Sequence, residues 1–244
     1  KRGDRPDLDA TSRMSPHLKF GEIHPRTMLA DIAGLPGDEP FRRQIAWREF
    51  YADVLLAWPG SARKYFHPQL AAMRYDVGAG ADRHVRAWRA GRTGFPIVDA
   101  GMRQLLGEGW MNNRLRMIVA SFLIKDLHQE WSVGAQHFMN LLVDADIASN
   151  QQSWQRCAGV GPDPAPYFRI ADPVSQGRKF DPLGDYVRRW VPELREVPGP
   201  AVHEPWKLPG GIPSGYPAPI VDHAAEREES LVRYRATTAR GGNP

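Results

Sequence analysis

The stretch that decides the fold runs from residue 112 to residue 128 and reads NNRLRMIVASFLIKDLH. Its apolar side chains recur three and four positions apart, which is the spacing of one face of an α-helix. They are Leu115, Ile118, Val119, Phe122 and Leu123. Asn112 or Asn113 can cap the first turn, because a side-chain oxygen there accepts a hydrogen bond from a free backbone N–H. The stretch therefore predicts an amphipathic helix.

On either side of this stretch, the same spacing predicts further helices and no alternating strands. Pro96 suits the first turn of one helix, and Gly107 and Gly109 supply its end. Other helices are expected at 41–57, 134–143, 183–191 and 223–237. Residues 159–184 and 197–219 are rich in Pro and Gly and predict long loops, of which Pro166 to Arg169 attract interest because they combine aromatic rings and charge. The predicted fold class is all-α in one domain.

Composition sets limits on the kind of protein. The chain has 244 residues, 42% of them apolar, which is enough to build a full core. A single cysteine, Cys157, excludes an internal disulfide and fits a reducing compartment. No apolar run approaches the roughly 20 residues that cross a bilayer, and the basic start lacks a signal-peptide pattern, so a cytoplasmic protein is expected. The net charge of +4 favours acidic partners only where it is clustered.

Several polar groups have two readings each. Asp144, Asp146 and Asn150 follow an apolar helix and fit either a helix cap or a polar cofactor edge, with Arg116 as a partner for one carboxylate. Arginines three positions apart form either a phosphate-binding helix face or a solvated one. They are Arg83, Arg86, Arg89 and Arg92. No phosphate loop or metal-spaced histidine pair occurs, so no metal is expected.

Four motifs carry a specific resemblance. They are TSRMSPHL (11–18), WREFY (47–51), RTGFPIVDAGMRQL (92–105) and WMNNRLRM (110–117). Together with APYFRI (165–170), QGRKFDP (176–182) and HEPW (203–206), they resemble the photolyase/cryptochrome family over nearly the whole chain. The resemblance is to the family's C-terminal helical FAD-binding domain, whereas the N-terminal α/β antenna domain has no counterpart in these residues.

The resemblance implies one monomeric domain over residues 1–244, with a leading segment at 1–10, a loop at 197–219, and a C-terminal helix and tail at 220–244. It also implies bound FAD. Thr11, Ser12, Met14 and Ser15 are then expected near the FAD phosphates, Arg116 is expected to pair with Asp144, and Asn150 is expected beside the flavin N5. The implied cofactor residues are Thr11, Ser12, Arg13, Met14, Ser15, Arg116, Asp144, Ala145, Asp146 and Asn150.

For electron transfer, the resemblance implies that Trp154 and Trp131 are the inner and middle members of a photoreduction chain. The family's outer tryptophan is missing, and Tyr75 is a candidate substitute. Indoles can relay single electrons, although each tryptophan also fits the alternative reading of a simple core residue.

The resemblance further implies a face that binds DNA carrying pyrimidine dimers. Its candidate residues are Gln44, Trp47, Arg48, Asn113, Arg114, Met117, Arg156, Arg169 and Gln176. Asn113 and Met117 stand where enzymes that repair the (6-4) photoproduct carry two histidines, which favours cyclobutane dimers. Gln44 replaces a usual glutamate, and Arg156 replaces a second tryptophan that packs on the lesion.

The expected function is therefore light-driven repair of cyclobutane pyrimidine dimers by electron transfer from excited reduced FAD. One alternative is a cryptochrome-like blue-light sensor or DNA-binding module without efficient repair. Another is that this half alone holds no FAD.

Overall fold

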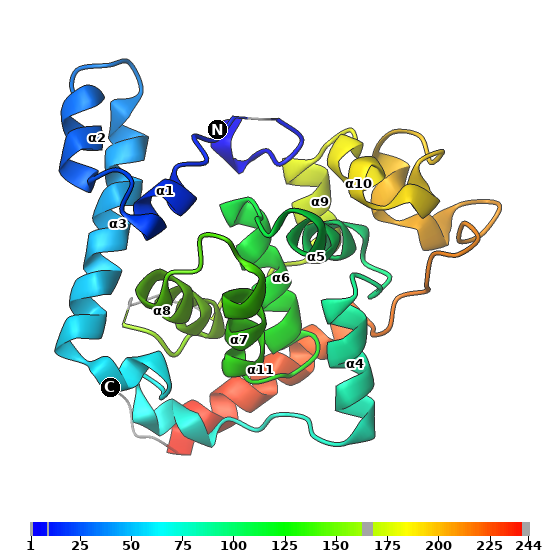
Figure 1. Cartoon of the computed structure of the whole chain (residues 1–244). Helices are drawn as coiled ribbons and strands as arrows, with labels where there is room; N and C mark the ends of the chain where they lie inside the picture. The colour runs from blue at the N-terminus through cyan, green and yellow to red at the C-terminus, as the bar shows by residue number, and fades with distance from the viewer. Residues whose placement is uncertain (1, 9, 163–167, 241–244) are drawn as a thin grey trace.

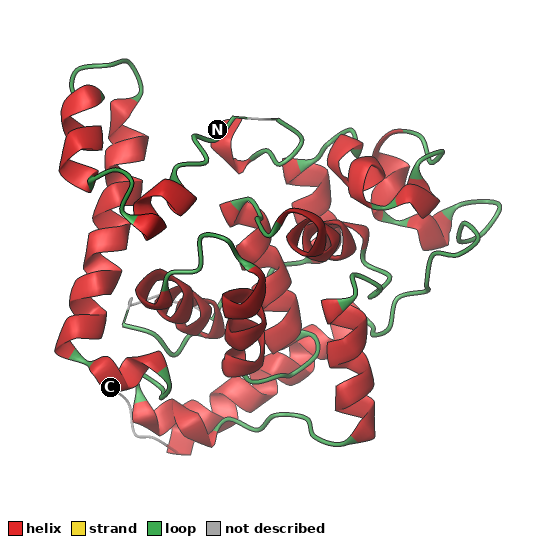
Figure 2. Ribbon diagram, in the orientation of Figure 1, coloured by secondary structure: helices red, strands yellow, loops and turns green. Residues whose placement is uncertain are grey.

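The computed structural model describes residues 2–8, 10–162 and 168–240, and this described part consists of helices and loops without a strand (Figures 1 and 2). The all-α prediction is thus confirmed. The α-helices are α1 (Ser15–Phe20), α2 (Pro25–Asp31), α3 (Asp38–Ala57), α4 (Ala79–Arg89), α5 (Pro96–Glu108), α6 (Asn113–Lys125), α7 (Trp131–Leu141), α8 (Ile147–Ala158), α9 (Pro173–Phe180), α10 (Asp185–Trp190) and α11 (His223–Arg240). The short 3-10 turns are η1 (Arg2–Asp4), η2 (Pro59–Ala62), η3 (Pro68–Ala72), η4 (Pro192–Leu194), η5 (Gly199–His203) and η6 (Pro205–Lys207).

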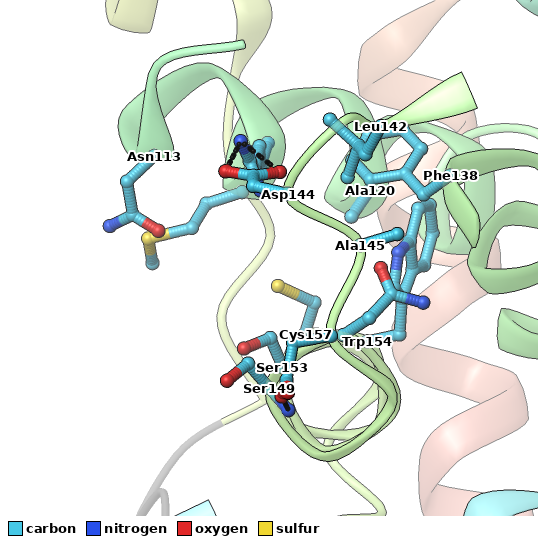
Figure 3. A pocket seen from close by; sticks show the side chains of 14 residues that line it. Asn113, Ala120, Phe138, Leu142, Asp144, Ala145, Ser149, Ser153, Trp154 and Cys157 are labelled. Atoms are coloured by element: carbon cyan, nitrogen blue, oxygen red, sulfur yellow. Dashed lines mark hydrogen bonds and ion pairs between the residues drawn. The ribbon is translucent and has the colours of Figure 1, made fainter. Parts of the chain in front are cut away.

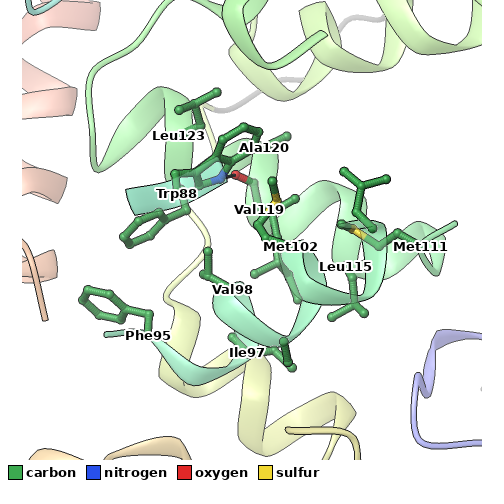
Figure 4. Packing of buried hydrophobic residues seen from close by; sticks show 14 of the residues in the cluster. Trp88, Phe95, Ile97, Val98, Met102, Met111, Leu115, Val119, Ala120 and Leu123 are labelled. Atoms are coloured by element: carbon green, nitrogen blue, oxygen red, sulfur yellow. Dashed lines mark hydrogen bonds between the residues drawn. The ribbon is translucent and has the colours of Figure 1, made fainter. Parts of the chain in front are cut away.

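Helix α6 lies at the centre of the molecule, as its sequence pattern predicts (Figure 1). Asn112 caps it, because its side chain accepts a hydrogen bond of 2.8 Å from the backbone N–H of Arg114. The apolar face packs on α5 and α8. Figure 4 shows the part of this core between α4, α5 and α6, where the indole of the fully buried Trp88 donates a 3.0 Å hydrogen bond to the carbonyl of Val119.

The end of helix α5 anchors the loop between α7 and α8, which carries Asp144 and Asp146. Pro96 occupies its first turn, and Gly109 ends it in a left-handed conformation at φ 62° that favours glycine. The carbonyl of Gly109 then accepts a 2.8 Å hydrogen bond from the backbone N–H of Val143. The chain between α7 and α8 is therefore tied to the end of α5, directly before Asp144.

Helices α7 and α8 pack against each other closely enough to require a glycine. A Cβ atom at Gly134 on α7 would lie 2.1 Å from the ring of Trp154 on α8, which no real contact allows. The missing side chain at Gly134 thus admits the indole of Trp154 between the two helices.

The expected long loops are partly wrong. Residues 159–184 contain α9, which begins at Pro173 after Asp172, whose side chain accepts a 2.6 Å hydrogen bond from the backbone N–H of Ser175. A capping aspartate followed by proline is a start signal for a helix, and it outweighed the surrounding Pro and Gly content. The expected loop at 197–219 includes η5 and η6.

Predicted helices at 41–57, 134–143, 183–191 and 223–237 are confirmed as α3, α7, α10 and α11, with shifted ends. The short helices α1 and α2 fall outside every predicted range. Of the aromatic loop segment, Pro166 and Tyr167 lie outside the described residues, as do parts of the expected leading segment and tail. Within the described ranges, no helix combines the length and apolarity that a membrane span requires.

Candidate functional site

A cavity opens between α6, α7, α8 and the loop that joins α7 to α8 (Figure 3). Its volume is about 150 Å³, and it is partly open to solvent. One wall is aromatic and apolar, and the opposite rim is polar. The lining residues are Asn113, Arg116, Met117, Ala120, Phe138, Leu142, Asp144, Ala145, Asp146, Ser149, Asn150, Ser153, Trp154 and Cys157.

An ion pair between Arg116 and Asp144 borders this cavity (Figure 3). The Nη2 atom of Arg116 lies 3.1 Å from Oδ1 and 2.8 Å from Oδ2 of Asp144, whose side chain is 2% exposed. The Nε atom of Arg116 donates a further 2.8 Å hydrogen bond to the carbonyl of Met111. Because the Arg116 guanidinium is held by both Met111 and Asp144, its orientation in the pair is fixed.

Asp146 is the N-cap of α8, as one interpretation of the sequence predicted. Its Oδ1 accepts a 2.8 Å hydrogen bond from the backbone N–H of Ser149, which starts α8. The same residue also lines the cavity, so the cap reading is confirmed and the reading as a cofactor edge stays a prediction. Asn150 lies one turn further along α8 and is buried, with its Nδ2 donating to the carbonyl of Ala135 at 3.0 Å and to Oε1 of Gln151 at 3.1 Å.

The aromatic wall consists of Trp154 and Phe138, whose ring centroids are 5.0 Å apart and whose planes are almost perpendicular. The structure therefore brings five of the ten expected cofactor residues to one cavity. These are Arg116, Asp144, Ala145, Asp146 and Asn150.

The other five expected cofactor residues, 11–15, lie at the start of α1 and are not among those that line the cavity. Arg13 instead lies over the ring of Trp110 at 4.4 Å and 3.7 Å from Oε2 of Glu108. The expected place of this segment at the phosphates of FAD stays a prediction. Two residues expected on the DNA face, Asn113 and Met117, do line the cavity, and so does Cys157, to which the sequence assigned no site role.

Tyr65, which no sequence motif singled out, contacts two residues of the expected electron chain, Trp131 and Tyr75. Trp131 and Trp154 are both buried, and Trp131 makes an edge contact with Tyr65 at 6.2 Å between ring centroids. The hydroxyl of Tyr65 donates a 3.0 Å hydrogen bond to that of Tyr75. Burial raises the pKa of both tyrosines, so both are neutral at pH 7. Tyr65 lies in a loop without any motif, so no local pattern identified it.

Beside the cavity, α3 and α8 present Trp47 and Arg156 together. The guanidinium of Arg156 lies 4.8 Å from the ring centroid of Trp47, a cation–π arrangement. Trp47 also contacts the rings of Phe50 and Tyr51 at 5.5 and 5.6 Å. Sequence reasoning assigned Trp47 and Arg156 to one surface, and the structure brings them into contact.

Most of the remaining DNA-face candidates are exposed or have partners of their own. Gln44 is exposed on α3, and Arg48 forms an ion pair with Glu49 at 2.8 Å. Arg114 pairs with Asp4 at 3.0 Å and lies over the ring of Phe180 at 4.6 Å. Gln176 is half-buried on α9.

The backbone carbonyl of Arg169 is held by a hydrogen bond from the end of α6. The ammonium group of Lys125 at the end of α6 donates to the carbonyl of Arg169 and lies 4.3 Å from the ring centroid of Phe168. The side chain of Arg169 is itself exposed. Burial lowers the pKa of Lys125 to about 8, because removal from water disfavours its charge.

The arginine repeat forms an exposed face of α4. Arg83, Arg86 and Arg89 are exposed there, while Arg92 follows the helix and lies 3.7 Å from Oε1 of Glu193. Both the phosphate reading and the solvated reading are compatible with this arrangement. Among the described residues, no group of three or more His, Cys, Asp or Glu side chains is placed to hold a metal ion.

Known proteins are similar to this chain over most of its length. A family model described as the FAD binding domain of DNA photolyase matches residues 41–236. The chain is 51% identical over 223 residues to a protein of Streptomyces griseus named deoxyribodipyrimidine photo-lyase, covering 90% of this chain and 48% of that protein. A protein of the same name from Escherichia coli is 44% identical over 250 residues, covering 96% and 51%. The chain therefore spans about half the length of the curated relatives it matches.

Solved structures are similar to the whole fold. A bacterial class III photolyase from Agrobacterium tumefaciens superposes with a TM-score of 0.91 at 44% identity, covering 97% of this chain and 51% of the other. An archaeal photolyase from Sulfolobus tokodaii, described with two FAD molecules, gives 0.89 at 35% identity, covering 96% and 52%. A Synechocystis cryptochrome gives 0.85 at 30% identity, covering 95% and 51%.

Proposed function

The chain belongs to the family of the FAD binding domain of DNA photolyase, and from that premise we propose that it binds FAD in the cavity between α6, α7 and α8 and uses it to repair cyclobutane pyrimidine dimers in DNA with light. The observation that carries the proposal is the convergence of Arg116, Asp144 and Asn150 on this one cavity. These are side chains that the resemblance assigns to the cofactor.

The chemistry of the lining fits a flavin. A conjugated ring needs an apolar surface, which Phe138, Leu142 and Trp154 offer. Its polar edge needs donors and acceptors that are already oriented, and the Arg116–Asp144 pair and the Asn150 amide provide them. Bound there, reduced FAD supplies the light-excited electron that splits the two bonds joining the pyrimidines. The residues of this chain then have to bind and orient FAD and the dimer and to exclude water from the site. This reaction needs no general acid or metal.

For the substrate, we assign DNA recognition to the surface around Trp47 and Arg156. An extruded pyrimidine dimer needs a flat aromatic surface to stack on and cations for its phosphates. Trp47 offers the indole, and Arg156 offers a planar cation directly above it. Arg114 and Arg169 extend the positive charge toward α6 and the segment before α9.

Asn113 and Met117 support cyclobutane dimers as the lesion. Both line the cavity one helical turn apart on α6, and neither transfers a proton as a histidine pair would. At these two positions the chain therefore offers no acid for a lesion whose repair requires proton transfer there.

For photoreduction, we propose that electrons reach the cavity through Tyr75, Tyr65, Trp131 and Trp154. The hydrogen bond between the two tyrosines and the edge contact of Tyr65 with Trp131 support the outer half of this route. Phe substitution of Trp131 should slow the light-driven reduction of bound oxidised FAD, while repair by chemically reduced protein continues.

The deciding experiment mixes chemically reduced, FAD-loaded protein with an oligonucleotide that carries one thymine dimer and counts restored thymines after blue light. The expected result is restoration in light and none in a dark control. A cryptochrome-like sensor is the second candidate, because Arg156 stands in the lesion surface and a cryptochrome shares the fold. Dimer binding with no restoration in light would favour that candidate, and absence of a bound flavin spectrum would contradict both.

A further inference from the structure

We propose that Gln151 is a positioning residue, which locks the Asn150 amide so that only its oxygen faces the cavity and the site thereby favours reduced over oxidised FAD. The inference rests on the proposed function in its choice of FAD as the occupant. The locked amide itself follows from the hydrogen bonds of three neighbouring groups.

The first fixed point is the carbonyl of Ala135 on α7. It lies 3.0 Å from one terminal atom of the Asn150 side chain. The two ends of an amide have the same shape, so hydrogen-bonding partners decide which is oxygen and which is nitrogen. A backbone carbonyl can only accept, so the end of Asn150 that faces Ala135 must be the NH₂ group.

The second fixed point is the carbonyl of Ala62 at the end of η2. Nε2 of Gln151 donates a 2.8 Å hydrogen bond to it, and by the same reasoning this end of Gln151 must be the NH₂ group. The oxygen of Gln151 is then the end that faces Asn150, and it accepts from Asn150 Nδ2 at 3.1 Å. The orientation of both amides is thus set from both ends by backbone carbonyls.

Rotation of the Asn150 amide by half a turn is therefore costly. It would place Oδ1 against two acceptors, the carbonyl of Ala135 and Oε1 of Gln151, and would break two hydrogen bonds in a buried place. With Gln151 present, the amide keeps one orientation whatever occupies the cavity. Without Gln151, one of the two contacts that oppose rotation is gone.

One polar atom of Asn150 is left for an occupant. Its Nδ2 is engaged by Ala135 and Gln151, and in the described ranges no protein group donates a hydrogen bond to Oδ1. Because Asn150 lines the cavity, this oxygen is the atom that it offers. An acceptor requires a donor, and a reduced isoalloxazine ring carries an N–H at N5 where the oxidised ring carries only a lone pair. An amide locked this way discriminates between the two redox forms.

A matched control exists on the same helix. Gln152 is fully buried and joins α8 to the same η2 segment, through a 2.7 Å hydrogen bond to Oγ of Ser61, but has no hydrogen bond to Asn150. Gln151→Met and Gln152→Met therefore each remove one link between α8 and η2 with nearly unchanged side-chain volume. Only the first removes an acceptor from Asn150.

The experiment measures the dissociation constants of the apo chain for oxidised FAD and, without oxygen, for dithionite-reduced FAD. Loss of one neutral hydrogen bond corresponds to about a fivefold change. We expect Gln151→Met to lower the ratio of oxidised to reduced dissociation constants by about that factor, whereas Gln152→Met leaves it unchanged. In an Asn150→Ala background, Gln151→Met should have no further effect on the ratio, because it acts through Asn150.

A second measurement needs no cofactor. Exchange of the Asn150 side-chain NH₂ protons with solvent, followed by NMR, should be slow in the parent chain and in Gln152→Met, and at least several-fold faster in Gln151→Met. Equal exchange in all three would overturn the locked amide. Faster exchange with an unchanged FAD ratio would overturn the redox role alone, and absence of binding by either form of FAD would overturn the proposed function while the exchange result still decides the lock.

Discussion

The cavity and the surface around Trp47 and Arg156 are built in opposite ways. In the cavity, Asp144 and Asn150 are buried, and each is held by partners on another element of the fold. On the surface, Arg156 is exposed and rests on Trp47, which is itself only half-buried. The cavity is fixed before any ligand arrives, whereas the surface is made of side chains that can rearrange.

The difference follows from the free energy of burial. A buried charge or amide without a partner costs several kcal/mol, so each one in the cavity is held by a specific partner and its replacement is rarely neutral. Exposed charged groups interact weakly, at about 0 to 1 kcal/mol, so replacements there change affinity without unfolding the chain. Gln44 and Arg156, the two departures from the family pattern that the DNA face carries, are both exposed.

The largest expected effect is a loss of stability when the ion pair that borders the cavity is removed. Arg116→Met leaves the carboxylate of Asp144, 2% exposed, without its cation and should lower the free energy of unfolding by about 3 to 5 kcal/mol. Chemical denaturation would measure it. The control is Arg114→Met on the same helix, whose ion pair with Asp4 is about one-quarter exposed on both sides and should cost at most about 1 kcal/mol. Equal losses would remove the contrast between the two regions.

The next effect concerns Lys125, whose buried ammonium group donates a hydrogen bond to the carbonyl of Arg169. The pKa of Lys125 is about 8 in the folded chain, lowered by burial from 10.5, so between these two pH values unfolding takes up a proton. Stability therefore rises with pH in this window. Relative to Lys125→Met, the unfolding free energy should increase by roughly 3 kcal/mol from pH 8 to pH 10.5. Parallel pH profiles of the two proteins would contradict a buried, charged Lys125.

A smaller effect tests the packing of the cavity wall. Gly134→Ala would place a methyl group 2.1 Å from the Trp154 ring and 2.7 Å from Leu123, so the indole must move. We expect a loss of about 1 to 3 kcal/mol, together with a changed Trp154 fluorescence or near-ultraviolet signal. Gly80→Ala on α4, whose nearest neighbour would be 3.8 Å away, should be neutral or slightly stabilising.

The smallest effect on the fold is expected at the DNA surface. Trp47→Ala should weaken binding of dimer-containing single-stranded DNA by about 1 to 3 kcal/mol through lost stacking. Arg156→Ala should reduce the salt dependence of that binding by about one unit of slope if it contacts phosphate. Fluorescence anisotropy at several salt concentrations measures both. A large loss of stability in Arg156→Ala would show that this surface is as rigid as the cavity.

The sequence predicted the central helices because their signals are local. The apolar spacing of α6 and its asparagine cap lie within one short segment, as do the proline and glycine at the ends of α5. Helix α9 was missed although Asp172 and Pro173 mark its start, because the surrounding Pro and Gly content favoured a loop. Capping chemistry was the stronger signal there.

The sequence by itself predicted part of the cavity lining, because the resemblance assigned Arg116, Asp144, Asp146 and Asn150 to one cofactor. Only the tertiary structure decided which groups meet across the fold: Gln151 with Ala62, Tyr65 with Tyr75 and Trp131, and Arg156 with Trp47. The physical reason is that helix periodicity and capping depend on neighbours within a few residues. Contacts between helices depend instead on how close their backbones pack, as the missing side chain at Gly134 permits for Trp154.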